Sequence, residues 1–158
     1  MFALAYHITW TTYGTWLPGD ERGWVRKNTT GIQEPNAIIA MNARKRMKEN
    51  PVHLSSLQRG FVECTIRQHC LIRGWLLQAV NVRSNHIHVV VTAGCDADEV
   101  MKQLKAWCSR KLSDAADLKQ ISPTKSGRKR WFTEGGNRKL IHTEQYLDNA
   151  IQYVLDGQ

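Results

Sequence analysis

Two histidines with a single residue between them are the clearest sign of chemistry in this chain. His86 and His88 lie within the run NHIHVVV at residues 85–91, whose β-branched residues predict a strand. Successive side chains of a strand point to opposite faces, so both imidazoles face one way while Ile87, Val89 and Val91 face the other. Imidazole binds divalent transition ions well, and a rigid strand reduces the entropy lost on binding. The spacing therefore predicts a two-histidine metal platform.

The same spacing has a purely structural interpretation. The two histidines could lie on an open sheet face, or be buried with their nitrogens bonded to backbone carbonyls. An otherwise apolar strand rarely contains two polar groups unless they are satisfied or functional, which favours the metal platform. The cysteines do not add ligands, because they form neither a CxxC pair nor a zinc-ribbon spacing and are expected to be reduced thiols: Cys64, Cys70, Cys95 and Cys108.

Two tyrosines near the end of the chain are candidate nucleophiles. Tyr146 and Tyr153 are seven residues apart, so on a helix they lie within about 20° of each other on one stripe. A tyrosine hydroxyl has a pKa of about 10 and needs a metal-polarised phosphate or a nearby base to attack a phosphodiester. Most helix tyrosines are packing residues, and periodicity does not choose between these two.

The elements that must position these groups follow from periodicity and from helix caps. Strands are expected at 6–13, 75–83, 86–92 and 138–142, and core helices at 55–72, at 96–112 and from Thr143 onward. The stretch at about 20–54, with a short helix at 36–49, is expected to be a loop and helix insertion after the first strand. The order strand, helix, strand, strand, helix, strand predicts an α+β, ferredoxin-like (βαββαβ) antiparallel sheet with one extra C-terminal helix.

Length and charge limit the classes of function. The 158 residues suit a single domain spanning 1–158, and 42% hydrophobic residues indicate a chain with a real core. The net charge of +8, from 22 Lys and Arg against 14 Asp and Glu, favours an anionic partner such as nucleic acid, although such an excess can also serve solubility alone. The chain shows neither a signal peptide nor an apolar run of 18 residues, so a cytoplasmic protein without a membrane partner is expected.

Basic residues gather on one predicted helix and on the loop before the last strand. These are the candidate DNA contacts, and they are expected to bind phosphates: Lys102, Lys105, Arg110, Arg128, Lys129, Arg130 and Arg138. Exposed tryptophans at 16, 24 or 131 could stack unpaired bases, although each could equally be a core residue.

The chain resembles a known family at several of these points. The string NHIHVVV, the upstream segment YHIT followed by TTYGTWLPGD, and the terminal AIQYVLDGQ are similar to the HUH single-tyrosine transposases of bacterial insertion sequences. The closer likeness is to their relatives, the tyrosine transposases associated with repetitive extragenic palindromes. The resemblance runs from Tyr6 to Gln158 and includes the family's ferredoxin-like fold.

The resemblance implies an activity and assigns roles. His86 and His88 would bind a divalent ion, Mg or Mn, that polarises a phosphate of single-stranded or hairpin DNA. Tyr153 would attack that phosphate, leaving a 5′-phosphotyrosine link and a free 3′-hydroxyl, and the reverse attack would rejoin strands during transposition and recombination. Relatives act as monomers or as homodimers, and the sequence does not choose between them.

The sequence departs from the family pattern at the third metal ligand. The family commonly has a polar side chain one helical turn after the tyrosine, where this chain has Gly157. Gln158 is the nearest equivalent, but it points away from Tyr153 on a continuous helix and can contribute only if the helix breaks at Gly157. Gln152 and Asp156 are substitutes. Serine at position 84, where the family often has proline, is a milder departure.

Two other classes of protein fit less well. A non-catalytic nucleic-acid-binding domain of RRM-like shape would share the sheet, but the aromatic motif of that class is missing. A metal hydrolase such as an amidohydrolase or a cupin would need more ligands or a larger barrel than this chain can build.

Overall fold

The computed structural model describes residues 3–26, 28–117 and 128–156. Ten helices and strands occur in these ranges, in this order: β1 Ala5–Thr11, β2 Trp24–Val25, β3 Ile32–Gln33, α1 Ala37–Arg46, α2 Ser56–Arg73, β4 Leu76–Val82, β5 His86–Thr92, α3 Ala97–Asp117, β6 Asn137–Ile141 and α4 Glu144–Asp156. Leaving out β2, β3 and α1, the order is βαββαβ followed by α4, as the sequence predicts.

The central sheet has four strands in the order β4-β5-β1-β6. Every neighbouring pair is antiparallel, and β1 lies in the middle, between β5 and β6. This is the ferredoxin-like arrangement, in which the two helical crossovers return on the same side of the sheet. The predicted fold class is confirmed.

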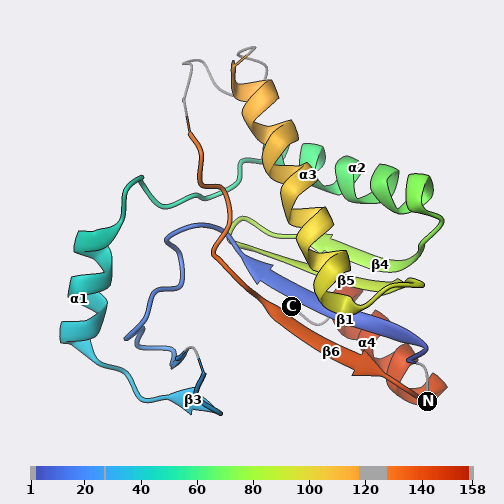
Figure 1. Ribbon diagram of the computed structural model, residues 1–158, viewed down its shortest axis with the longest axis horizontal. Helices are drawn as coiled ribbons and strands as arrows, with labels where there is room; N and C mark the ends of the chain where they lie inside the picture. Colours follow the sequence, from blue (N-terminus) through green and yellow to red (C-terminus); the bar gives the residue numbers. More distant parts are fainter. Residues whose placement is uncertain (1–2, 27, 118–127, 157–158) are drawn as a thin grey trace.

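The long helices α2 and α3 cover one face of the sheet (Figure 1). Alternate residues of the two central strands are buried there, among them Ile8 and Trp10 of β1 and Ile87 and Val89 of β5, all at 1% exposure or less. They pack against apolar residues spaced along both helices, including Val62, Ile66, Leu104 and Cys108. The helix α2 begins at a capping box on Ser55 and ends at Gly74 in the left-handed region, because both ends carry the residue types that satisfy free backbone groups.

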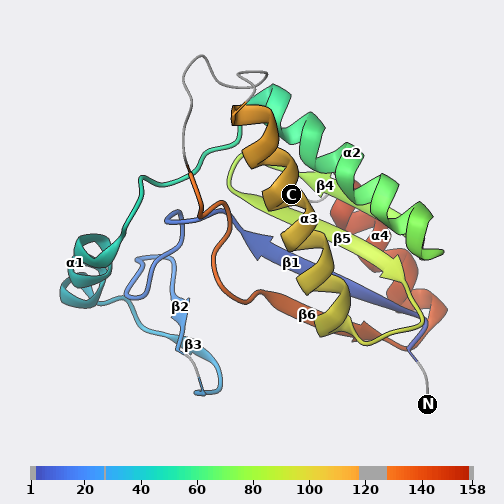
Figure 2. The ribbon, with the colours of Figure 1, turned by 45° about the horizontal axis from the view of Figure 1, so that its top comes forward.

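The last helix, α4, lies on the opposite face, where it packs mainly on β4 and β5 (Figure 2). A second, smaller apolar cluster joins it to the sheet: Ala5, Ala79, Val90, Ile141, Leu147, Ala150 and Val154. Thr143 caps the helix, since its hydroxyl accepts a hydrogen bond from the N–H of Tyr146. Since α4 covers one side of this face, the polar side chains of β1 and β6 stay accessible.

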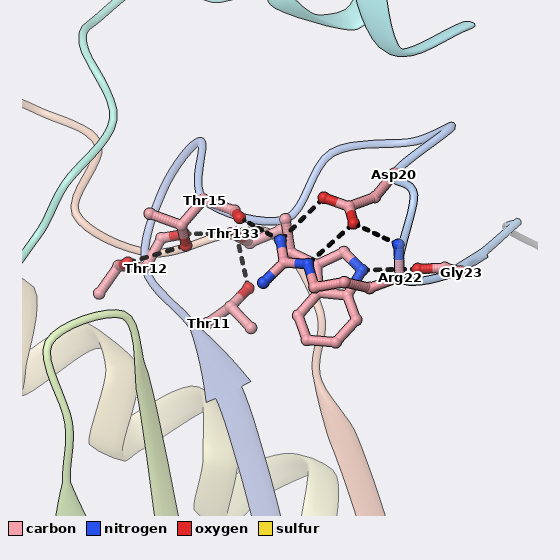
Figure 3. A network of polar contacts seen from close by, with 8 residues as sticks. Thr11, Thr12, Thr15, Asp20, Arg22, Gly23 and Thr133 are labelled. Atoms are coloured by element: carbon pink, nitrogen blue, oxygen red, sulfur yellow. Dashed lines mark hydrogen bonds and ion pairs between the residues drawn. The ribbon is translucent and has the colours of Figure 1, made fainter. Parts of the chain in front are cut away.

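The insertion after β1 forms a lobe to one side of the sheet, containing α1 and a short β2–β3 hairpin (Figures 1 and 2). The sequence indicates only a loop before α1, and two-residue strands are too short for a periodic signal. A polar network ties the lobe to the end of β1 (Figure 3). In it, Thr11 donates to Thr133, Thr133 donates to the carbonyl of Thr12, and Arg22 bridges Asp20 and the carbonyl of Thr15.

The other boundaries match the sequence expectation within a few residues, except that α3 runs to Asp117 rather than to about 112. Gly157, the expected terminator of α4, lies outside the described residues. Within residues 3–26, 28–117 and 128–156, we find no helix that is both long and apolar enough to cross a membrane.

Candidate active site

The two histidines of β5 lie side by side on the face that carries α4. Val90, the next residue on this face, packs under α4, whereas Ile87, Val89 and Val91 belong to the opposite core. The ring centroids of His86 and His88 are 4.9 Å apart. Both imidazoles therefore face the same space, as the alternation of the strand predicts.

Each imidazole is oriented through its Nδ1 atom. In His88, Nδ1 lies 3.0 Å from Oγ1 of Thr9 and 3.2 Å from Nε2 of His7. In His86, Nδ1 lies 2.7 Å from Oδ1 of Asn85. Partners of this kind fix the ring orientation and, when Nδ1 carries the proton, direct the lone pair of Nε2 outward. That arrangement is the one in which an imidazole binds a metal.

The surroundings of His88 and His7 favour the neutral forms of these two rings. Burial, followed by the influence of His86, His7 and Arg83, lowers the pKa of His88 to about 4. Burial and then the nearby Lys139 lower the pKa of His7. A histidine must be neutral to bind a metal, so His88 is available as a ligand at physiological pH.

One tyrosine of α4 reaches this cluster. The Tyr153 ring centroid lies 5.8 Å from that of His88 and 6.0 Å from that of His7. Tyr146 lies nearer the start of α4 and is 47% exposed, and among the described residues no ring contact joins it to a histidine. Asn81, which pairs with His88 across the β4–β5 ladder, donates its side-chain amide to the carbonyl of Val154 at 2.9 Å. The last turn of α4 is thereby fastened to the sheet beside Tyr153.

The donor set fits a divalent ion in part. Two imidazoles on a rigid strand match the chemistry of transition ions. Gln158, the predicted third ligand, lies outside the described residues, and of its substitutes the Gln152 amide donates to the Asp156 carboxylate. Among the described residues, no group of three or more histidine, cysteine, aspartate or glutamate side chains is placed to hold a metal ion. The candidate ligands among the described residues are His86 and His88.

Three residues of the cluster were not singled out from the sequence: His7, Thr9 and Asn81. The signal for His7 and Thr9 is present in the alternation of β1, where both share a face with Ala5. Their approach to His88 also depends on the β1–β5 register, which pairs Thr9 with His88. Asn81 depends similarly on the β4–β5 register. Sequence periodicity gives the face of each strand but not these registers.

Most of the predicted DNA contacts lie elsewhere and already have partners within the protein. Lys105 donates to the carbonyls of Thr133 and Gly135, and Arg138 pairs with Asp98 near the start of α3. Arg130 lies 3.8 Å from Glu49, Arg128 donates to the carbonyl of Asn50, and Arg110 lies over the ring of Trp107. The side chains of Lys102 and Lys129 are exposed. The basic residues of α3, together with Arg138, lie on the face of the sheet that α2 and α3 cover. His86, His88 and Tyr153 lie on the opposite face.

The predicted stacking residues are also divided. Trp131 is 4% exposed and Trp24 is 7% exposed, so both belong to the protein interior. Trp16 is 41% exposed and lies in the lobe against the Arg22 guanidinium, whose central carbon is 4.1 Å from the centroid of the tryptophan ring. Of the three, Trp16 has the most surface for a base.

Comparison with known proteins supports the fold. No protein-family model matches the chain, and no curated protein matches it. Among solved structures, a REP-associated tyrosine transposase bound to a REP hairpin superposes with a TM-score of 0.56 at 11% identity, over 98% of this chain and 66% of that one. A candidate transposase of Deinococcus radiodurans R1 matches with a TM-score of 0.46 at 16% identity, over 99% of this chain and 92% of that one.

The chain thus has the fold of a REP-associated tyrosine transposase and spans about two thirds of that protein's length. The resemblance predicted from the sequence is confirmed at the level of the fold.

Proposed function

We propose that this protein is a metal-dependent enzyme that cuts and rejoins single-stranded DNA through a covalent phosphotyrosine. The observation that carries the proposal is the meeting of His86, His88 and Tyr153 on one face of the sheet. All three come from one chain, so a monomer contains the nucleophile and two ligands. The fold shared with a transposase that binds a REP hairpin makes hairpin DNA the substrate class to test.

The reaction is a transesterification. The Tyr153 hydroxyl oxygen attacks the scissile phosphorus, the bond from phosphorus to the 3′ oxygen breaks, and the 5′ side stays on the tyrosine. The phenol loses a proton and the leaving 3′ oxygen gains one, so no net proton and no ATP are required. Mg or Mn held by His86 and His88, with Gln158 as the predicted third ligand, would polarise the phosphate.

The residues of this chain position the nucleophile and the imidazoles. Thr9 and His7 orient His88, and Asn85 orients His86. Asn81 anchors α4 through the carbonyl of Val154, which restricts the distance between the Tyr153 ring and the histidines. Holding the reacting groups in place in this way supplies much of the rate enhancement in such reactions.

The test is a denaturing gel that detects protein linked to labelled hairpin DNA in the presence of Mn, with and without a chelator. The hairpins should come from repeats beside the protein's own gene, because an arbitrary hairpin could fail through specificity alone. We expect an adduct that disappears with Tyr153→Phe, with His86→Ala and with chelator. Tyr146→Phe, on the same helix, is the matched control and should still form the adduct.

An adduct that survives Tyr153→Phe and disappears with Tyr146→Phe would assign the nucleophile to the other tyrosine. Tight hairpin binding without an adduct would instead indicate a non-catalytic DNA-binding domain.

A further inference from the structure

His86, His88 and Tyr153, which we call the catalytic cluster, lie on one face of the sheet, and the basic residues of α3 lie on the other. A DNA strand that reaches Tyr153 therefore needs a path that does not run along α3. On the cluster's own face, α4 packs on β4 and β5. The neighbouring part of β1 and β6 is left uncovered. The accessible side chains there are Thr9 of β1 with Asn137 and Lys139 of β6, which we call the β1–β6 strip.

The strand register places this strip directly beside the cluster. Thr9 pairs with His88 on one side and with Asn137 on the other, so the three form one row across the sheet. His7 pairs with Lys139 in the next row. Directly opposite residues of antiparallel strands have Cβ atoms about 4.5–5.5 Å apart, so the three residues of a row span about 9–11 Å.

The chemistry of the strip suits a phosphodiester. When His88 carries its proton on Nδ1, it donates to Thr9, and the Thr9 hydroxyl keeps its own proton to donate. Asn137 offers an amide, and Lys139 offers an ammonium that lies close enough to lower the pKa of His7. Among the described residues, no carboxylate forms an ion pair with Lys139. Hydroxyl, amide and ammonium donors are the groups that contact DNA phosphates in proteins.

We infer that the β1–β6 strip is a binding site for the DNA backbone and holds a phosphate next to the scissile one. This inference rests on the proposed function, because it takes its direction from the site of cleavage. Lys139 is the main contact, with Asn137 and Thr9 as neutral donors. Arg138, the adjacent residue of β6, faces the other side and is paired with Asp98, so the strand itself separates the two faces.

The test measures binding without chemistry. The Tyr153→Phe protein is titrated with a fluorescein-labelled DNA hairpin that has unpaired flanks, and anisotropy is followed over a range of salt concentrations. The hairpin is the one used in the gel assay, so that its flank binds in one register, and the phosphate contacts still make the affinity depend on salt. Lys139→Gln should weaken binding by about threefold to tenfold and reduce the slope of log K against log salt by about 1. Lys111→Gln, at an exposed position of α3 that is not among the candidate DNA contacts, is the matched control and should change neither.

A second measurement locates the phosphate. A neutral methylphosphonate is placed at one flank position at a time in the same hairpin. At one position, the methylphosphonate should weaken binding to the protein that retains Lys139 but should have no effect on binding to the Lys139→Gln protein. Equal effects of Lys139→Gln and Lys111→Gln, a larger effect of Lys111→Gln, or an unchanged methylphosphonate profile would each overturn the inference. Asn137→Ala should add a smaller loss at the same position.

The gel assay separates the two proposals. If the adduct forms but Lys139→Gln does not change DNA binding, the cleavage proposal stands and the β1–β6 strip is rejected as a DNA-binding site. Coupling between Lys139 and one phosphate without any adduct would leave the strip as a DNA-binding site and remove the cleavage proposal.

Discussion

Protonation of His88 should destabilise the fold as the pH falls. Its side chain is 8% exposed, and burial together with nearby His86, His7 and Arg83 lowers its pKa from 6.5 to about 4. The unfolded chain therefore binds a proton near pH 6.5, whereas the folded protein resists it until about pH 4. The stabilising effect of the neutral imidazole is fully present above the unfolded pKa and is lost as the pH falls toward the folded one.

The expected size follows from the difference between the two pKa values. Each pKa unit corresponds to about 1.36 kcal/mol. Between pH 7 and pH 5, which crosses most of this window, the free energy of unfolding should fall by roughly 2 kcal/mol from His88 alone. Such a loss is a large fraction of the stability of a domain of this size.

The assay is urea unfolding followed by tryptophan fluorescence at pH 7 and at pH 5, with a chelator present. His88→Asn is the comparison protein, because its amide nitrogen stands where Nδ1 was and can still donate to Thr9. Titrating groups that do not interact with His88 are present in both proteins and cancel in the difference. The loss of stability should be about 2 kcal/mol larger in the protein that keeps His88. Equal losses in the two proteins would refute the assignment of a depressed pKa to this residue.

Two further predictions concern the segment that follows residue 128. Gly136→Ala should destabilise the fold by about 1–3 kcal/mol, because an added Cβ would lie 2.6 Å from Sδ of Met101 and 2.7 Å from the carbonyl oxygen of Thr9. Thermal unfolding would measure this loss, and a neutral effect would show that the backbone relaxes there. Lys105→Met should also destabilise the fold, by about 1–3 kcal/mol, because it removes both hydrogen bonds to the carbonyls of Thr133 and Gly135. The slope of DNA binding against salt should stay constant in that variant, and a slope that falls by about 1 would instead make Lys105 a phosphate contact.

The sequence predicted most of the fold because its signals were local. The alternation around His86 and His88 gave the face of β5. The sequence offered Ser55 or Ser56 as the start of α2 and Gly74 as its end, and the structure has the cap at Ser55. The order of elements then left few topologies to consider. The β2–β3 hairpin was missed because two residues in each strand are too few to show a period.

The candidate site was predicted in part, for a different physical reason. His86 and His88 are two positions apart in one strand, so one periodicity brings them together. Tyr153 meets them only through tertiary packing, and the sequence preferred it to Tyr146 through the family resemblance alone. The positive charges on α3 indicated an anionic partner but not the face of the sheet on which that partner binds. That face depends on how the strands and helices are stacked.

The strand β5 meets two sets of constraints at alternating positions. Ile87, Val89 and Val91 are buried in the larger core, while His86 and His88 face the opposite side. A complete single-substitution map of residues 86–89 should therefore show two phenotypes in strict alternation, which ends at Val90 because that residue packs under α4. Polar substitutions at the core positions should reduce the amount of folded protein in the cell, whereas substitutions at the two histidines should leave its abundance largely intact and remove its chemistry. Recombination between distant relatives would have to exchange β5 as a unit, since a shift by one residue would reverse both roles at once.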